Sequence, residues 1–250
     1  MQVYKKMMNI GKQKGLSLIE LMISMALGLF LLAGLSYAFI TMNNTAITRK
    51  NLSDLQDTQR ISMYLLTSFL QNTGYYIYGT GVTSTSAFPI ETVTGGGSTI
   101  SFTAGQTVSG TSGTSDTIAV RYFANPDFPQ GTCSNVSSSS TSVKYTDVFS
   151  INSTGSLICE ETAGSSYYSR VIADNVSKMK VTYGVESGTN SGSVNIYVTD
   201  PTLFPVTYPW TAIKTVTITL TYIYKDKNLS TGLTSTKVFS RTIPVMNAVI

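Results

Sequence analysis

Residues able to support acid–base, nucleophilic or metal chemistry are scarce in this sequence. The 250 residues include no histidine, and charged side chains make up 12% of them. Histidine is the commonest general base and the commonest metal ligand, so its absence disfavours hydrolase triads and zinc sites. The remaining options, Asp/Glu or Ser/Lys pairs, lie in no recognisable motif. We therefore predict that the protein is not an enzyme and has no catalytic residue, metal site or cofactor.

The two cysteines, Cys133 and Cys159, are the next candidates for covalent chemistry. They lie in a Ser/Thr-rich region typical of exported proteins, and disulfides form and persist outside the cytoplasm. A Cys133–Cys159 disulfide is therefore predicted. Two unpaired thiols are the alternative.

A single acid, Glu20, stands at the start of a long apolar stretch. Residues 21–48 contain no charged side chain. On membrane-insertion scales a charged residue inside an apolar helix costs about 2.5–3.5 kcal/mol, so a buried Glu20 would require a partner. The alternative is an acid near the membrane interface, where the N-terminus of the helix stabilises it at little cost.

The segment 21–40 has the length and apolarity to cross a bilayer as a helix of about 20 residues. Four lysines precede it, and the first fourteen residues contain no acid. Because positive charge stays in the cytoplasm, the C-terminal side should face the periplasm or the exterior. A secretory signal peptide is the alternative, but its apolar region would be shorter and would end at a small-residue cleavage site.

A continuous helix is predicted over residues 16–73, since the helical pattern continues beyond Ile40 and no proline occurs before Pro89. Its second half is amphipathic, with apolar residues mostly three or four positions apart. These residues are Leu52, Leu55, Met63, Leu66 and Leu70. Gly74 follows as a natural helix stop.

From Gly74 onward the pattern changes to a period of two, which is typical of β-strands. Strands are predicted over residues 117–124, 178–186, 214–225 and 237–245. In the third of these, apolar residues alternate with threonines, so one face should pack on the helix and the other should see solvent. Gly/Ser/Thr-rich surface loops are predicted over 79–97, 105–115 and 135–142. The expected fold class is α+β, with an antiparallel β-sheet domain over residues 74–250.

The basic character of the chain comes from its N-terminal end. The formal net charge is +4, but four of the 17 basic residues precede Gly15, and the rest of the chain has 13 basic and 13 acidic side chains. No direct nucleic-acid partner is therefore expected. The fifteen tyrosines could form an aromatic platform for carbohydrate or DNA. Packing of sheets and loops is the simpler interpretation.

The segment KGLSLIEL, from Lys14 to Leu21, resembles the processing site of type IV prepilins and type II secretion pseudopilins. The resemblance implies a pilin fold and removal of residues 1–15 as a leader by a prepilin peptidase, which cleaves between Gly15 and Leu16. It also implies methylation of the new N-terminal amine of Leu16. In this family the acid, here Glu20, pairs with the N-terminal amine of a neighbouring subunit.

Weaker likenesses further along the chain resemble the PilW group of minor pilins. They are SDTIAVRY at 115–122, VTYGV at 181–185 and the segment that begins at Trp210. The resemblance implies a minor pilin that primes or caps type IV pilus assembly and takes part in adhesion or twitching motility. The implied partners are the peptidase, other minor pilins, the major pilin and, as a further candidate, a large tip adhesin.

The implied location is the inner membrane, crossed once with the C-terminal domain in the periplasm, and later the pilus at the cell surface. Two alternatives stay open at this point. One is an adhesive or binding module displayed at the fibre tip. The other is a pseudopilin of a type II secretion system, which needs the same leader, acid and helix.

Overall fold

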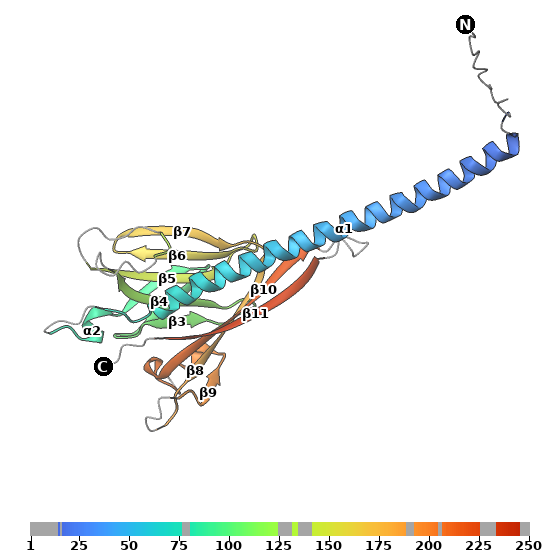
Figure 1. The fold of residues 1–250 in the computed structure, drawn as a ribbon. Coiled ribbons are helices and arrows are strands. Elements are labelled where there is room, and N and C mark those ends of the chain that lie inside the picture. The colour runs from blue at the N-terminus through green and yellow to red at the C-terminus, as the bar shows by residue number, and fades with distance from the viewer. Residues whose placement is uncertain are drawn as a thin grey trace, which may run out of the picture.

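The computed structural model consists of one long helix and a β-rich part (Figure 1). It describes Gly15 and residues 17–76, 81–124, 132–134, 142–188, 193–204, 207–225 and 234–245. Helix α1 (Leu18–Gln71) contains 54 residues. Its N-terminal half projects away from the sheets, and its C-terminal half lies along them (Figure 1).

The C-terminal half of α1 is held by its apolar stripe. Leu55, Met63, Leu66 and Leu70 are buried in the main core, and Leu52 is partly buried against it. Burial of each such side chain contributes about 1.5–3 kcal/mol relative to exposure. The predicted amphipathic stripe is therefore the surface that joins the helix to the sheets.

Helix α1 ends where the sequence pattern indicates a stop. Gln71 is its last residue and Asn72 caps it. Gly74 follows with a φ of 81°, a left-handed conformation that glycine adopts without steric penalty. The Gly74 N–H donates to the carbonyl of Arg121 at 2.9 Å, which fixes the chain as it leaves the helix.

The strands form two main antiparallel sheets and a separate hairpin. The five-stranded sheet has the order β3-β4-β5-β6-β7, made of β3 (Val108–Thr111), β4 (Thr117–Ala124), β5 (Val143–Ile151), β6 (Leu157–Ala163) and β7 (Ser166–Ala173). The four-stranded sheet has the order β11-β10-β8-β9, made of β8 (Val176–Val185), β9 (Ile196–Val198), β10 (Ile213–Lys225) and β11 (Thr234–Pro244). The hairpin is β1 (Glu91–Gly95) with β2 (Ser98–Phe102). The short helices are α2 (Ser84–Ala87), η1 (Pro201–Leu203) and η2 (Trp210–Ala212).

The central strand β10 follows its sequence alternation. Val216, Ile218 and Leu220 are fully buried in the core shared with α1. The intervening threonines are half-exposed, and Thr217 and Thr219 form cross-strand hydrogen bonds of 2.8 and 3.0 Å to hydroxyls on β11. The fold class, α+β with a long helix packed on antiparallel sheets, is confirmed.

The loop predictions over 79–97 and 105–115 are wrong in part. Strand β1 and helix α2 lie in the first segment and strand β3 in the second. Polar composition concealed these three elements because each is short and buries few apolar residues, such as Val93 in β1 and Val108 in β3. Strands β2, β5, β6, β7 and β9 were not predicted. The predicted loop over 135–142 lies, except for Ser142, outside the described residues.

Candidate functional site

Glu20 lies in the first turn of α1 and is exposed to solvent. Its backbone N–H donates to the carbonyl of Ser17 at 3.0 Å, and its own carbonyl accepts from the Ser24 hydroxyl at 2.8 Å. The Ser17 side chain does not cap the helix. The carboxylate therefore sits at the end of α1 where the free N–H groups and the helix dipole favour a negative charge.

The predicted processing junction lies immediately before this turn. Gly15 is exposed and outside the helix, and a Cβ added there would meet no atom within 4 Å. Leu16, the predicted new N-terminus, lies outside the described residues. The structure thus places Gly15 and Glu20 at the same end of α1. Both residues are exposed, so another protein can reach them.

The N-terminal half of α1 exposes an almost continuous apolar surface. Its large exposed side chains are Leu18, Ile19, Leu21, Met22, Ile23, Met25, Leu27, Leu29, Phe30, Leu31, Leu32, Leu35, Tyr37, Phe39, Ile40 and Met42. The helix is long and apolar enough to cross a membrane, and none of its most apolar stretch is buried. It runs without interruption through Gly28 and Gly34, where an added Cβ would meet no heavy atom within 4 Å. An apolar surface of this size indicates a membrane anchor.

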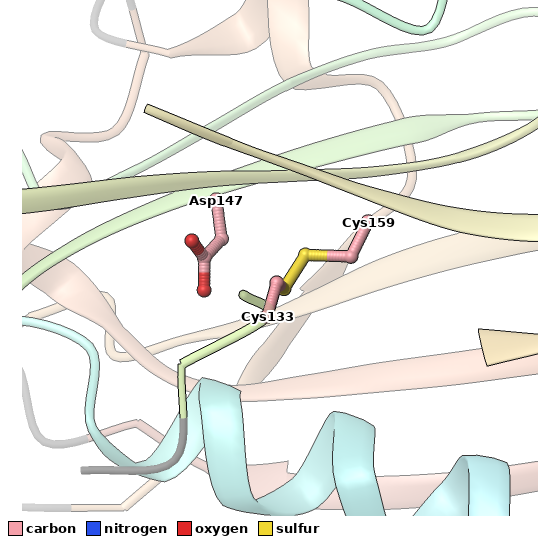
Figure 2. Close-up of side chains that lie close together, drawn as sticks. All are labelled: Cys133, Asp147 and Cys159. Atoms are coloured by element: carbon pink, nitrogen blue, oxygen red, sulfur yellow. A yellow bond between two sulfur atoms is a disulfide. The ribbon is translucent and has the colours of Figure 1, made fainter. Parts of the chain in front are cut away.

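Cys133 and Cys159 form a disulfide, as predicted, with Cα atoms 6.2 Å apart. Cys133 lies in the segment 132–134 and Cys159 on β6. Figure 2 shows the carboxyl of Asp147 beside the disulfide, and these three groups come within 4.8 Å of one another. Because the two sulfurs are bonded to each other, the cluster offers a carboxyl group but no thiolate.

Asp147 on β5 and Glu161 on β6 are buried and directly opposite in the ladder, which sequence reasoning missed. The Tyr122 hydroxyl donates to Asp147 Oδ2 at 2.9 Å. Glu161 accepts from the backbone N–H of Cys133 at 2.6 Å and from the Ser134 hydroxyl at 2.5 Å. Burial, and then the charge of Glu161, raise the pKa of Asp147 well above its usual range.

Arg121 on β4 is a second buried charge that sequence reasoning missed. Its guanidinium lies 4.4 Å from the ring centre of Phe102 and 5.4 Å from that of Phe88. It also pairs with Glu91 at 3.5 Å. Burial lowers the pKa of Arg121 to about 10, an effect that Glu91 opposes, so the group stays cationic at neutral pH. An arginine inside an otherwise apolar strand was the one available sequence signal.

Comparison with known proteins gives one family match. Residues 10–36 match the model of the prokaryotic N-terminal methylation motif. This range contains the Gly15–Leu16 junction, Glu20 and about the first five turns of α1. A search of curated proteins finds no match to the chain.

Proposed function

We propose that this type IV pilin-like prepilin is a minor pilin, a structural subunit that primes or caps the assembly of a type IV pilus. A prepilin peptidase would cleave it between Gly15 and Leu16, and the amine of Leu16 would be methylated. The chain is then a substrate of the peptidase rather than an enzyme. Its proposed partners are other minor pilins, the major pilin and a large tip adhesin.

The observation that carries this proposal is the N-terminal methylation motif over residues 10–36, continuous with the exposed apolar half of α1. That surface requires lipid before assembly and packing against other apolar helices after it. We place the protein first in the inner membrane, with its β-rich part in the periplasm, and then in the pilus. The PilW-like segments favour a minor over a major pilin.

Processing between Gly15 and Leu16 is the first prediction. In cells with an active prepilin peptidase, we expect the membrane-extracted protein to begin with an N-methylated Leu16. Mass spectrometry of its N-terminal peptide measures this directly. The matched variant Gly15→Val should accumulate with its leader, because its side chain would add steric bulk where glycine enters the peptidase cleft without any. An intact leader on the wild-type protein, or a start beyond residue 30, would rule processing out.

The second prediction concerns pilus number. A priming subunit is needed in few copies, so deletion of its gene should leave fewer pili of normal appearance rather than altered pili. Electron microscopy of surface fibres provides the count, with a strain carrying the restored gene as the control. Normal pilus numbers with a block in protein secretion would instead identify a type II pseudopilin. Neighbouring genes for secretion-channel components would point the same way.

A further inference from the structure

Two carboxyl groups face each other inside the five-stranded sheet without a cation beside them. Asp147 and Glu161 are direct cross-strand partners, and both are fully buried. Among the described residues, neither takes part in an ion pair. Opposing residues in a sheet have Cβ atoms about 4.5–5.5 Å apart. Two ionised carboxylates at this separation would lack both water and a counterion, so one of them must hold a proton.

The hydrogen-bond partners identify the protonated group as Asp147. Glu161 already accepts three hydrogen bonds, from the backbone N–H groups of Cys133 and Ser134 at 2.6 and 3.3 Å and from the Ser134 hydroxyl at 2.5 Å. Such donors stabilise an ionised carboxylate. Asp147 accepts only from Tyr122 on Oδ2, and its Oδ1 is buried with no donor in the described protein. A protonated Asp147 has a donor of its own, within hydrogen-bonding reach of Glu161.

We propose that Asp147 and Glu161 form a pH-sensitive latch, in which one shared proton holds the segment 132–134 against the sheet. When the pair loses that proton, two negative charges face each other and the carboxylates separate. Glu161 then leaves the N–H groups of Cys133 and Ser134 without their acceptor. Because the disulfide to Cys159 keeps the segment attached, its release is local and reversible.

In the part of the chain that the structure describes, no lysine or arginine forms an ion pair with either carboxyl group of the latch. Strands β4 and β5 contribute Tyr122 and Tyr145, whose rings stack with centres 5.7 Å apart. Strand β7 contributes Tyr168, opposite Glu161, and Arg170, opposite Cys159. Arg170 is exposed and lines a cavity of about 100 Å³ that the disulfide also lines, and to which α1 contributes Leu65, Ser68 and Phe69. Arg170 is therefore the cation nearest in register to the pair, but it is exposed and forms no ion pair with Asp147 or Glu161.

The position of the latch gives its release a structural consequence. The cavity is bounded by α1, by Thr132 and Cys133 of the latched segment, and by β6 and β7. Movement of that segment opens the contact between the end of α1 and the five-stranded sheet. The latch thus couples the surrounding pH to the packing of the β-rich part on its helix. This inference rests on the described side chains and does not depend on the proposed function.

The test compares the full-length protein in detergent with its Asp147→Asn variant. An asparagine accepts from Tyr122 and donates to Glu161 at every pH, so it imitates the protonated aspartate. The pKa of Asp147 is raised in the folded state, so its contribution to stability is complete below the unfolded value of 3.8 and is lost as pH rises. We expect the wild-type Tm to fall by about 3 °C per pH unit above pH 4 relative to the variant.

Amide hydrogen exchange locates the change. Exchange at Cys133 and Ser134 should accelerate with pH more steeply in the wild type than in Asp147→Asn. The N–H of Val181 is an internal reference. It donates to Asp116 at 3.0 Å, and the Asp116 carboxylate is paired with Lys180. Glu160→Gln is the matched control. Glu160 is the neighbouring acid on β6, and it accepts hydrogen bonds from Gly96 and Tyr167. This variant should keep the wild-type dependence of amide exchange on pH.

Two further measurements keep the latch falsifiable. Infrared spectra of the wild type at neutral pH should contain a buried protonated-carboxyl band that Asp147→Asn lacks. Tyr122→Phe should shift the pH transition upward, because the Tyr122 hydroxyl lowers the pKa of Asp147. Parallel pH profiles of Tm and exchange for wild type and Asp147→Asn, or the absence of that band, would overturn the proposal.

Discussion

Replacement of Glu20 by alanine should leave membrane insertion intact and sharply reduce incorporation into the minor-pilin complex. In the single chain Glu20 is exposed in the first turn of α1, where it can reach water or lipid headgroups. Its removal therefore costs insertion nothing. In the assembly that we propose, the N-terminal amine of a neighbouring subunit would be buried without its partner.

The size of this effect follows from the buried pair. Removal of one side of a buried ion pair typically costs about 3–5 kcal/mol. That energy corresponds to roughly two to three orders of magnitude in an association constant. Co-purification of the Glu20→Ala protein with its partner pilins measures the loss, and the number of surface pili should fall with it.

A matched variant separates charge from packing at this position. Glu20→Gln preserves the size and shape of the side chain but removes its charge, so it should lose nearly as much assembly as Glu20→Ala. Ser17→Ala, one helical turn earlier, should retain assembly because the Ser17 side chain does not cap α1. Wild-type co-purification and pilus counts for both Glu20 variants would identify Glu20 as an interfacial acid only. Since a subunit at the extreme tip has no neighbour above it, a loss of assembly would place this one beneath or beside another pilin.

The features that the sequence predicted are those with local causes. The long helix needs only an apolar run, a stripe at helical spacing and no proline. Strands β4, β8, β10 and β11 overlap their predicted ranges because each is a run of β-branched and aromatic residues. The disulfide followed from composition, because the chain has two cysteines and an exported character. None of these depends on knowing which strands are neighbours.

The features that the sequence concealed depend on contacts between distant segments. Strand β3 contains Gly110, where an added Cβ would collide with the Tyr183 hydroxyl and the Thr117 carbonyl. That glycine resembled a loop residue in the sequence but is required by close packing. Asp147 and Glu161 resembled ordinary surface acids, and only the register of β5 and β6 places them opposite each other. Their burial is a property of the ladder rather than of either strand alone.

Arg121 is the residue whose replacement should destabilise the β-rich part most. Its guanidinium donates to the carbonyls of Pro89 at 2.6 Å, Gln106 at 2.9 Å and Thr103 at 3.2 Å. These carbonyls lie in the segments just before β1 and just after β2, whereas Arg121 lies on β4. One side chain thus fixes the hairpin region to the five-stranded sheet. Its planar fork of donors suits three acceptors at once.

Arg121→Met keeps most of the volume and all of the apolar contact but supplies no donor. Each carbonyl left buried without a partner costs about 1–3 kcal/mol. Some of this cost disappears where the hairpin loosens and admits water, so we expect a loss of about 3–5 kcal/mol in the free energy of unfolding. Arg121→Lys keeps the charge but cannot reach three carbonyls, and we expect about half that loss. Denaturant unfolding of the full-length protein in detergent measures both.

A nearby cation is the control for charge alone. Lys144 also pairs with Glu91, at 2.8 Å, but its side chain is a quarter exposed and forms none of the carbonyl contacts. Lys144→Met should therefore cost less than about 1 kcal/mol. The loss in Arg121→Met should also be local, with faster amide exchange in the β1–β2 hairpin than in β10. If Arg121→Met unfolds at the same denaturant concentration as Lys144→Met, the carbonyl contacts of Arg121 do not hold the hairpin. If Arg121→Met does not fold, the same comparison is made with Arg121→Lys. This variant keeps the charge, so any loss of unfolding free energy comes from the different geometry of its donors.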